Sequence, residues 1–208
     1  MYVLMVNGSP HRDGCTRTAL DEIAGALAAE GIGSEIFWIG NDPLAGCIGC
    51  GSCARSGRCF RADAVNDFVE KARTADGFVF GSPVHYAAAS GALTSFLDRA
   101  FMVGKPLGIY RHKPAAAVTS ARRAGTTATL DQLNKYIVFH QMPLVPSQYW
   151  NMVHGSTPEQ VRQDAEGLQI MRTLGRNMAW MLKAFAAARE AGIVPPEAEA
   201  PIRTSFIR

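Results

Sequence analysis

The chain lacks long hydrophobic runs, and its net charge is small. No apolar stretch among its 208 residues approaches the roughly 18 to 20 residues that a membrane-spanning helix needs. The opening MYVLMV has no basic flank and leads directly into a turn, unlike a secretory signal. The formal charge is +3, from 21 basic and 18 acidic residues scattered along the chain. We therefore expect a cytoplasmic protein with no membrane or nucleic-acid partner.

Cysteine is scarce and concentrated in one place. Four of the five cysteines lie within the segment GCIGCGSCARSGRC, residues 46–59. Cytoplasmic thiols stay reduced, and a chain with 48% hydrophobic residues has enough apolar material for one buried core. A scaffold of disulfides is therefore not expected. Metal ligation, redox chemistry and plain thiols remain as uses for the segment.

Short apolar strands alternate with helices that carry one apolar face. The pattern predicts strands at residues 2–6, 35–39, 77–81, 115–119 and 144–150, and helices at about 16–30, 63–72, 93–101, 128–140 and 159–189. Strict alternation requires crossover connections, so we expect a parallel sheet covered on both faces. The predicted fold is an α/β domain at residues 1–189, with a flavodoxin-like, doubly wound, five-stranded parallel sheet in three α/β/α layers. A C-terminal tail or arm is predicted at residues 190–208.

In that strand order, ligands bind beyond the carboxyl ends of strands one and three. The loop after strand one, residues 7–16, suits an anion, because the helix start offers free amides and Ser9 and Thr16 add hydroxyl groups. Gly14 allows close backbone approach, and Arg12 adds a positive charge. The sequence lacks both GxGxxG and GxxxxGK[ST], so a terminal monophosphate fits better than a dinucleotide or a nucleoside triphosphate. The alternative is an ordinary turn in which Ser and Thr cap a helix.

Two further loops belong to the same edge of the predicted sheet. The loop after strand three, GSPVHYAAASG at residues 81–91, places a stiff proline and two flat side chains beside small residues, where a planar ring would stack. The loop after strand four, SARRAGTT at residues 120–127, offers amides and hydroxyls to the polar edge of the same ring. Pro, Gly and Ser are frequent in any turn, so the prediction rests on the agreement of the three loops.

Four stretches together resemble a known family: NGSPHRDGCT, ADGFVFGSPVHYAAASGALTSFLDR, SARRAGTT and QDAEGLQIMRTLGRNMAW. Over residues 1–188, the chain is similar to the NAD(P)H-dependent FMN reductase and iron-sulfur flavoprotein family of flavodoxin-like folds. The resemblance implies that residues 1–189 are an FMN-binding domain. It implies that the phosphate lies against Ser9, Arg12, Gly14, Cys15 and Thr16, that the flavin ring lies against Pro83, Val84, His85 and Tyr86, and that further contacts come from Ser120, Ala121, Arg122, Arg123 and Gly125.

Two positions depart from the family's pattern. Cys15 stands where the family more often has Asn, and His85 stands where Tyr is common. For Cys15 we favour a structural role over a catalytic one, because a thiol is a small, weakly polar group that fits under a turn.

The cysteine segment follows predicted strand two, with the spacing Cys47-x2-Cys50-x2-Cys53-x5-Cys59. A short glycine-bearing loop with this spacing favours a cubane cluster, whereas structural zinc sites usually join two separated CxxC-like pairs. All four cysteines resemble those of the iron-sulfur flavoprotein branch. Two uses stay open: the four cysteines ligate a [4Fe-4S] cluster, or they are reduced thiols that shape the flavin pocket.

Two functions of different class follow. In the first, the chain is an enzyme, an NAD(P)H-dependent oxidoreductase that passes electrons through FMN to a quinone, nitro compound, flavin or protein acceptor. The cofactor carries this chemistry, so no catalytic residue is assigned. In the second, the chain is an electron carrier between FMN and a [4Fe-4S] cluster. A flavin-free interaction domain is disfavoured by the three matching loops.

We also expect a homodimer or a homotetramer. A flavin at the sheet edge of so small a domain is open to solvent, and the resemblance implies that a neighbouring subunit covers it. The apolar residues Phe206 and Ile207 near the end of the tail also need a covering surface.

Overall fold

Five parallel strands form the central sheet in the computed structural model, which describes residues 1–202, 204 and 206. They are β1 (Tyr2–Asn7), β2 (Gly33–Trp38), β3 (Gly77–His85), β5 (Ala115–Ala121) and β6 (Met152–His154). Their spatial order is β2-β1-β3-β5-β6, which is the 2-1-3-4-5 order of flavodoxin-like sheets when the parallel strands are counted along the chain. The predicted fold is therefore confirmed. A two-residue strand, β4 (Ala88–Ala89), pairs antiparallel with β3.

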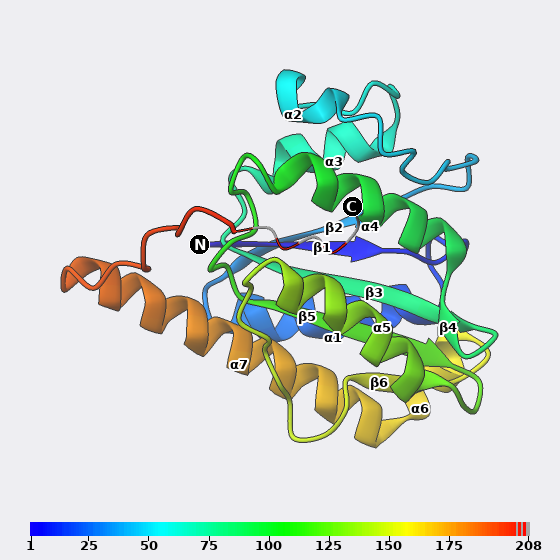
Figure 1. The fold of residues 1–208 in the computed structure, drawn as a ribbon. Helices are drawn as coiled ribbons and strands as arrows, with labels where there is room; N and C mark the ends of the chain where they lie inside the picture. The colour runs from blue at the N-terminus through cyan, green and yellow to red at the C-terminus, as the bar shows by residue number, and fades with distance from the viewer. Residues whose placement is uncertain (203, 205, 207–208) are drawn as a thin grey trace.

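Helices cover both faces of the sheet and complete three layers (Figure 1). One face carries α1 (Cys15–Ala29), α6 (Pro158–Gln163) and α7 (Ala165–Glu190), and the other carries α3 (Ala64–Ala72), α4 (Gly91–Gly104) and α5 (Thr126–Phe139). A short helix, α2 (Ser52–Ser56), lies outside α4 and contacts it. The sequence pattern did not predict α2 or β4, because neither is long enough to show a hydrophobic period.

The interior strand β1 shows why the sheet is covered by helices on both faces. Its sequence YVLMVN is a continuous apolar run rather than an alternating one. Val3 and Met5 pack with α1 and α7, while Leu4 and Val6 pack with α3 and α4. All four side chains are buried. A parallel strand buried on both faces requires this composition.

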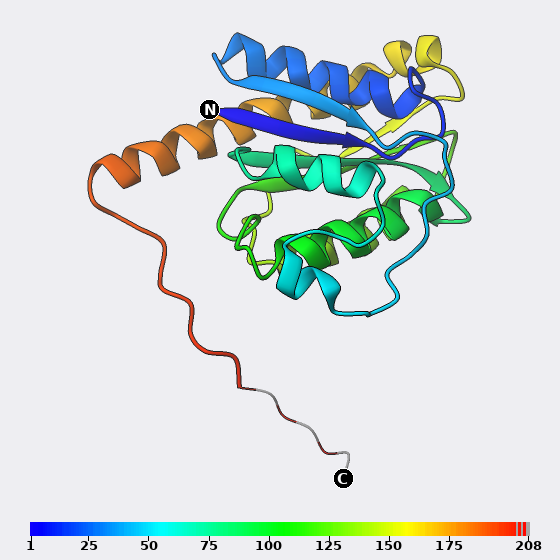
Figure 2. The ribbon, with the colours of Figure 1, turned by 90° about the horizontal axis from the view of Figure 1, so that it is seen from above.

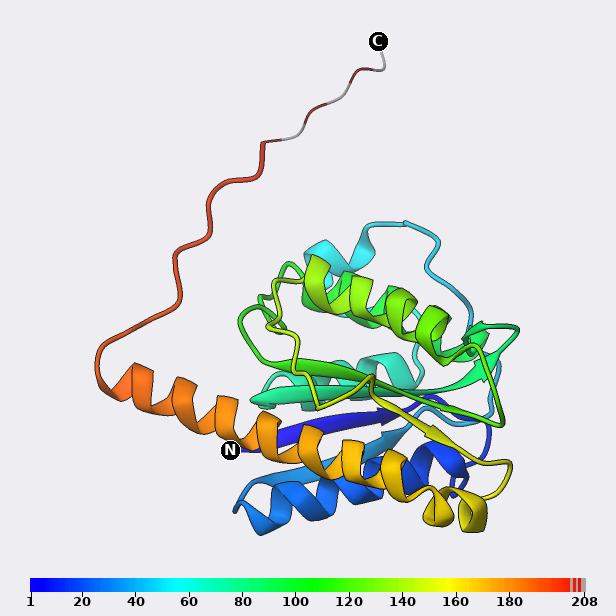
Figure 3. The same ribbon diagram turned by 90° about the horizontal axis from the view of Figure 1, so that it is seen from below.

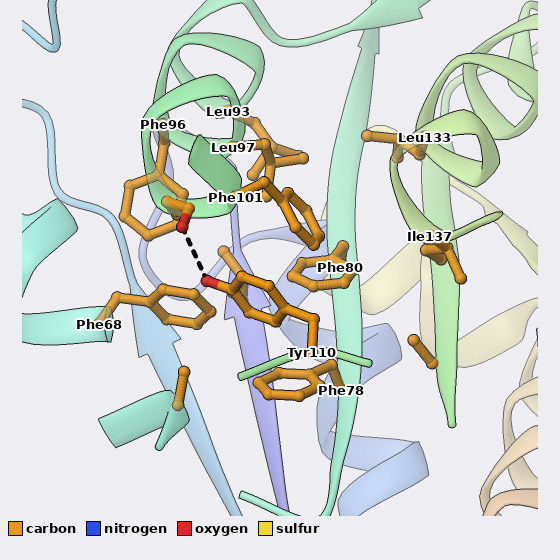
Figure 4. Close-up of a cluster of buried hydrophobic side chains, with 14 of the residues drawn as sticks. Phe68, Phe78, Phe80, Leu93, Phe96, Leu97, Phe101, Tyr110, Leu133 and Ile137 are labelled. Carbon is orange, nitrogen blue, oxygen red and sulfur yellow. Dashed lines mark hydrogen bonds between the residues drawn. The ribbon is translucent and has the colours of Figure 1, made fainter. Parts of the chain in front are cut away.

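Aromatic side chains fill the core between the sheet and α4 (Figure 4). The ring centroids of Phe80 and Phe101 lie 5.5 Å apart, and those of Phe78 and Tyr110 lie 5.4 Å apart. Tyr110 is buried, its hydroxyl donates to the Ala100 carbonyl at 3.0 Å, and burial raises its pKa. These contacts fix α4, which carries residues of the site described below.

The predicted strand at residues 144–150 is wrong in position. Leu144 forms only an isolated bridge with Ala115, and the strand that completes the sheet is β6. Pro146 explains the shift, because proline has no N–H to donate to a neighbouring strand. Pairing resumes where the Thr119 amide donates to the Asn151 carbonyl at 3.0 Å.

The long final helix predicted at residues 159–189 is two helices, α6 and α7. Asp164 separates them, since its carboxylate accepts hydrogen bonds from the amides of Gly167 at 2.9 Å and His154 at 2.7 Å. An aspartate that caps a new helix favours a break over continuation. No helix in the described part of the chain has the length and apolar character needed to cross a membrane.

The chain beyond α7 leaves the body of the domain (Figure 2, Figure 3). Residues 191–202 contain no helix or strand. One contact with the body is a hydrogen bond from Arg111 Nη2 to the Pro196 carbonyl at 3.0 Å. Of the two apolar residues expected to need cover, Phe206 is 91% exposed, and Ile207 lies outside the described residues.

Candidate functional site

The loops that follow β1, β3 and β5 meet at the carboxyl edge of the sheet (Figure 1). The Gly8 amide donates to the Gly81 carbonyl at 2.9 Å and joins the first loop to β3, which continues to His85 and so past the predicted strand end at residue 81. The hydroxyls of Thr16 and Ser120 lie 2.8 Å apart and join the start of α1 to the end of β5. The structure thus brings the three predicted loops together at the switch point of the sheet.

The first loop is folded around the buried side chain of Asn7. Its Nδ2 donates to the Arg12 carbonyl at 2.9 Å, and its Oδ1 accepts from the Ser9 amide at 3.1 Å. Ser9 Oγ in turn accepts from the His11 amide at 3.1 Å, and Trp38 Nε1 donates to the Ser9 carbonyl at 2.8 Å. Ser9 is buried, so its side chain shapes the loop. These hydrogen bonds stabilise the conformation of the loop.

The start of α1 offers backbone amides to an anion. Gly14 is the N-cap residue, no side chain caps the helix, and its first turn contains no acidic residue. A Cβ at Gly14 would lie 2.8 Å from His11 Cβ, so the turn has no room for a side chain there. Free first-turn amides and the helix dipole favour a phosphate. The donor set therefore fits the phosphate of FMN.

Thr16 joins the start of α1 to β5. It is 1% exposed, and its hydroxyl is hydrogen-bonded to that of Ser120, which is also buried. Either hydroxyl can be the donor, so Thr16 Oγ1 keeps further hydrogen-bonding capacity beside this pair. Its contact with phosphate stays a prediction.

The turn between β3 and β4 is strained and displays an aromatic ring. Tyr86 and Ala87 have φ values of 52° and 59°, the left-handed region that a two-residue hairpin turn requires and that glycine or asparagine usually occupies. The Tyr86 ring is fully exposed. Strain retained at an exposed aromatic residue is typical of a functional site.

The third loop packs directly against this turn. Gly125 has φ of +89°, and a Cβ there would lie 2.8 Å from Val84 Cγ1 and 2.9 Å from Ala87 Cα. Only glycine satisfies both the backbone angle and the close approach. The remaining predicted ring contacts are placed as follows: Pro83 and Val84 are half-buried, His85, Arg122 and Arg123 are exposed, and Ala121 is buried. Their flavin contacts stay predictions.

A groove of about 560 Å³ lies on the outer side of the first loop. Its lining includes Arg12, Gly14 and Cys15, together with residues that the sequence analysis did not name: Trp38, Asn41, Ser156 and Thr157. Trp38 ends β2, Asn41 follows it, and Ser156 and Thr157 follow β6. The end of the predicted strand at residues 35–39 was the available signal for the first two, whereas β6 was predicted at the wrong place and gave none for the others. Cys15 Sγ lies 3.5 Å from the Gly155 carbonyl, and burial raises the pKa of its thiol. A protonated, hydrogen-bonded thiol agrees with the structural role expected of Cys15.

The four clustered cysteines line one small cavity of about 110 Å³. Cys47 and Cys50 are exposed, whereas Cys53 and Cys59 are half-buried. Burial raises the pKa of Cys53, and the three neighbouring thiols raise it further. The other lining residues include Ile48, Phe60, Arg61, Arg99, Met102 and Val103.

The cysteine cavity is not arranged as a site for a single metal ion. Within residues 1–202, 204 and 206, no three His, Cys, Asp or Glu side chains converge as the ligands of one ion would. Thiolates are the ligands that iron-sulfur clusters use, and all four cysteines line this cavity. Arg61 Nε is buried, its residue lines the same cavity, and it has no hydrogen-bond acceptor among the described residues. Thiolate or sulfide sulfur would supply one.

A doubly wound sheet with an uncapped helix start and an aromatic turn at its switch point is typical of the class of flavodoxin-like proteins. The comparisons then give the family. The family model for NADPH-dependent FMN reductase matches residues 1–157, and the chain belongs to this family. It is accordingly an FMN-dependent oxidoreductase.

Two relatives are named iron-sulfur flavoproteins, and a solved structure shares the fold. An iron-sulfur flavoprotein of Methanocaldococcus jannaschii is 32% identical over 193 residues, which cover 88% of this chain and 98% of the relative. An iron-sulfur flavoprotein of Methanosarcina thermophila is 21% identical over 192 residues, which cover 91% and 100%. The flavodoxin WrbA-like protein of Agrobacterium tumefaciens shares the fold, with a TM-score of 0.61 and 16% identity, over 88% of this chain and 96% of that one.

Proposed function

We propose that the chain transfers electrons from NAD(P)H through FMN to a quinone, a nitro compound, a flavin or a protein acceptor. The observation that carries the proposal is the junction of an uncapped α1 start with a strained, ring-bearing turn at the switch point of the sheet. The first feature suits a phosphate monoester, and the second suits a planar ring. FMN combines the two, and the match to the FMN reductase family favours it over other mononucleotides.

In the proposed binding mode, one loop binds the phosphate of FMN and the other two bind its ring. The first-turn amides of α1 and the Arg12 guanidinium hold the phosphate, while Pro83 to Tyr86 and the segment from Ser120 to Gly125 hold the ring. When bound, FMN supplies the redox chemistry, taking electrons from a nicotinamide and releasing them to an acceptor. The protein's own residues position the cofactor and leave one side of the Tyr86 turn open to a substrate or partner.

We propose further that Cys47, Cys50, Cys53 and Cys59 ligate a [4Fe-4S] cluster. The shared cavity, the unpaired Arg61 Nε and the relatives named iron-sulfur flavoproteins support this assignment. Such a cluster supplies a one-electron centre beside the flavin chemistry. It favours the second candidate function, an electron carrier between flavin and cluster, as an alternative to turnover of a small acceptor.

The proposed assembly is a cytoplasmic homodimer or homotetramer. Reduced thiols are maintained in the cytoplasm. The exposed Tyr86 ring and the exposed Ile193, Val194 and Ile202 support a covering subunit, with residues 1–189 as the FMN-binding domain and residues 190–208 as an arm.

The test uses full-length protein purified without oxygen and supplied with iron and sulfide. FMN should bind far more tightly than riboflavin, and iron and acid-labile sulfide should approach about four per chain. Rapid NADH or NADPH oxidation with a saturating small acceptor would identify the enzyme, whereas slow oxidation with a fully reducible cluster would identify the carrier. Equal affinity for riboflavin and FMN would contradict the phosphate loop.

A further inference from the structure

The cysteine cavity contains a buried cation that the proposed function does not use. Arg99, in the middle of α4, is 2% exposed and is the largest fully buried side chain of the described residues. It lines the cavity together with the four cysteines. A charged side chain is rarely buried to this extent unless partners satisfy it.

The Arg99 guanidinium joins two side chains, Asp63 and Cys59, and its Nη1 also donates to the Ala45 carbonyl at 3.4 Å. Nη1 and Nη2 donate to the two carboxylate oxygens of Asp63 at 2.7 and 2.9 Å, a bidentate pair. Nε and Nη2 also face the sulfur of Cys59, at 3.4 and 3.2 Å. The carboxylate balances the positive charge of the guanidinium, so its main effect on the sulfur comes from directed N–H groups.

The backbone of Cys59 is held by hydrogen bonds, as its sulfur is. Its amide donates to Asn66 Oδ1 at 2.9 Å, and its carbonyl accepts from Asn66 Nδ2 at 3.0 Å. Asn66 is buried in the first turn of α3, and Asp63 caps that same helix. Cys59 is therefore held by α3 through its backbone and by α4 through its sulfur, whereas Cys47 and Cys50 lie on the exposed part of the loop.

We propose that Arg99 is a positioning residue for Cys59 and that its N–H groups set the potential at which the cluster accepts an electron. This inference rests on the proposed [4Fe-4S] cluster. One electron enters from the flavin, no bond forms or breaks, and the added negative charge is shared with the cysteine sulfurs. Donors from a buried guanidinium stabilise that charge more after reduction than before, so they raise the potential.

The experiment compares Arg99→Gln and Arg99→Lys with wild type and with Arg55→Gln. Arg55 lies on α2 in the same loop and is exposed, so its removal deletes one nearby charge without a hydrogen bond to Cys59. Full-length proteins are purified without oxygen and supplied with iron and sulfide. Iron and sulfide are measured per FMN, and the cluster is titrated with a reductant by absorbance and electron paramagnetic resonance.

Arg99→Gln should make reduction of the cluster roughly tenfold less favourable, which for a one-electron couple is about 59 mV. Arg99→Lys keeps the positive charge but loses the paired N–H groups of the guanidinium, so it should also lower the reduction potential of the cluster. Arg55→Gln should change the equilibrium constant for reduction of the cluster less than about twofold, because exposed charges are screened. Loss of iron from Arg99→Gln with FMN retained would also support positioning of Cys59.

Two results overturn the inference, and they are distinguishable. If wild type holds the cluster and both Arg99 variants keep its iron and its potential, Arg99 does not act on Cys59. If wild type takes up no iron or sulfide, the proposed cluster itself is wrong and the inference falls with it. If Arg99→Gln fails to fold, as judged by loss of FMN, the reduction potential of the cluster in Arg99→Lys is the deciding measurement. An unchanged potential in that variant overturns the inference.

Discussion

Replacing Asp63 should separate two contributions to stability, because its side chain has two partners. Oδ1 accepts from the Val65 amide at 3.2 Å and caps α3, and both oxygens bind the Arg99 fork. Asp63→Ala removes the cap and leaves a buried guanidinium without its carboxylate. Asp63→Asn keeps an oxygen for the cap and for one N–H of Arg99.

The expected loss of unfolding free energy depends on how deeply the two side chains are buried. Loss of the cap is expected to cost about 1 kcal/mol. Removing one partner of a buried ion pair costs about 3 to 5 kcal/mol when both partners are fully buried. Arg99 is 2% exposed but the Asp63 side chain is 28% exposed, so water replaces part of the interaction and the lower end applies. We expect a loss of about 3 to 4 kcal/mol for Asp63→Ala and about 2 kcal/mol for Asp63→Asn.

Urea unfolding monitored by circular dichroism measures these free energies, with the same FMN concentration for every variant so that ligand binding contributes equally. Asp67→Ala is the matched control, since Asp67 is an exposed carboxylate in the same first turn and should cost about 0.5 kcal/mol. Equal losses for the alanine and asparagine variants, or losses below that of the control, would refute the two-partner explanation.

The remaining predictions concern the flavin loops and the cysteines. Gly125→Ala should weaken FMN binding roughly tenfold in a fluorescence titration, because an L residue at φ of +89° is strained by about 1 to 2 kcal/mol and its Cβ would collide with the β3–β4 turn. Gly192→Ala, at φ of +81° in open space, should leave the affinity unchanged, and an equal effect in both would contradict the argument. Thr16→Val should weaken FMN binding about fivefold by calorimetry, because it removes the hydrogen bond between the first and third loops, worth about 1 kcal/mol; unchanged affinity would show that this bond does not shape the site. In cluster-free reduced protein at pH 8, iodoacetamide should modify exposed Cys50 before Cys15, because burial raises the pKa of Cys15 and its thiolate is the reactive form; mass spectrometry showing the reverse order would sink this.

Sequence patterns predicted the parts of this fold in which one physical signal dominates. The apolar run of β1 and the turn after it are local, so strand, loop and helix start could be read directly. The helix predicted at residues 63–72 has a local cause too, because the Asp63 side chain accepts from the Val65 amide at the start of α3. The order of the strands followed from the alternation of elements, because crossover connections leave few topologies.

The parts that could not be predicted depend on contacts between distant residues. The hydroxyl bond between Thr16 and Ser120 joins residues 104 positions apart, so no local pattern indicates it. Arg99 did leave a signal, because it stands on the apolar stripe of α4 three residues after Phe96 and four before Val103. A charge at that spacing predicts a buried ion pair, but the partners Asp63 and Cys59 emerge only from the tertiary structure.

Helix α4 ties the two halves of the site to one rigid element. At its N-cap, Ser90 Oγ donates to the Gly8 carbonyl of the first loop at 2.8 Å and accepts from the Leu93 amide at 3.2 Å. Nine residues later, about 13.5 Å along the axis at 1.5 Å per residue, Arg99 meets Cys59. Because the aromatic core fixes the helix between these points, the distance from the flavin loops to the cysteine cavity is set by helix geometry and not by the exposed cysteine loop. Changes in that loop would therefore alter the proposed cluster site without moving the proposed flavin site.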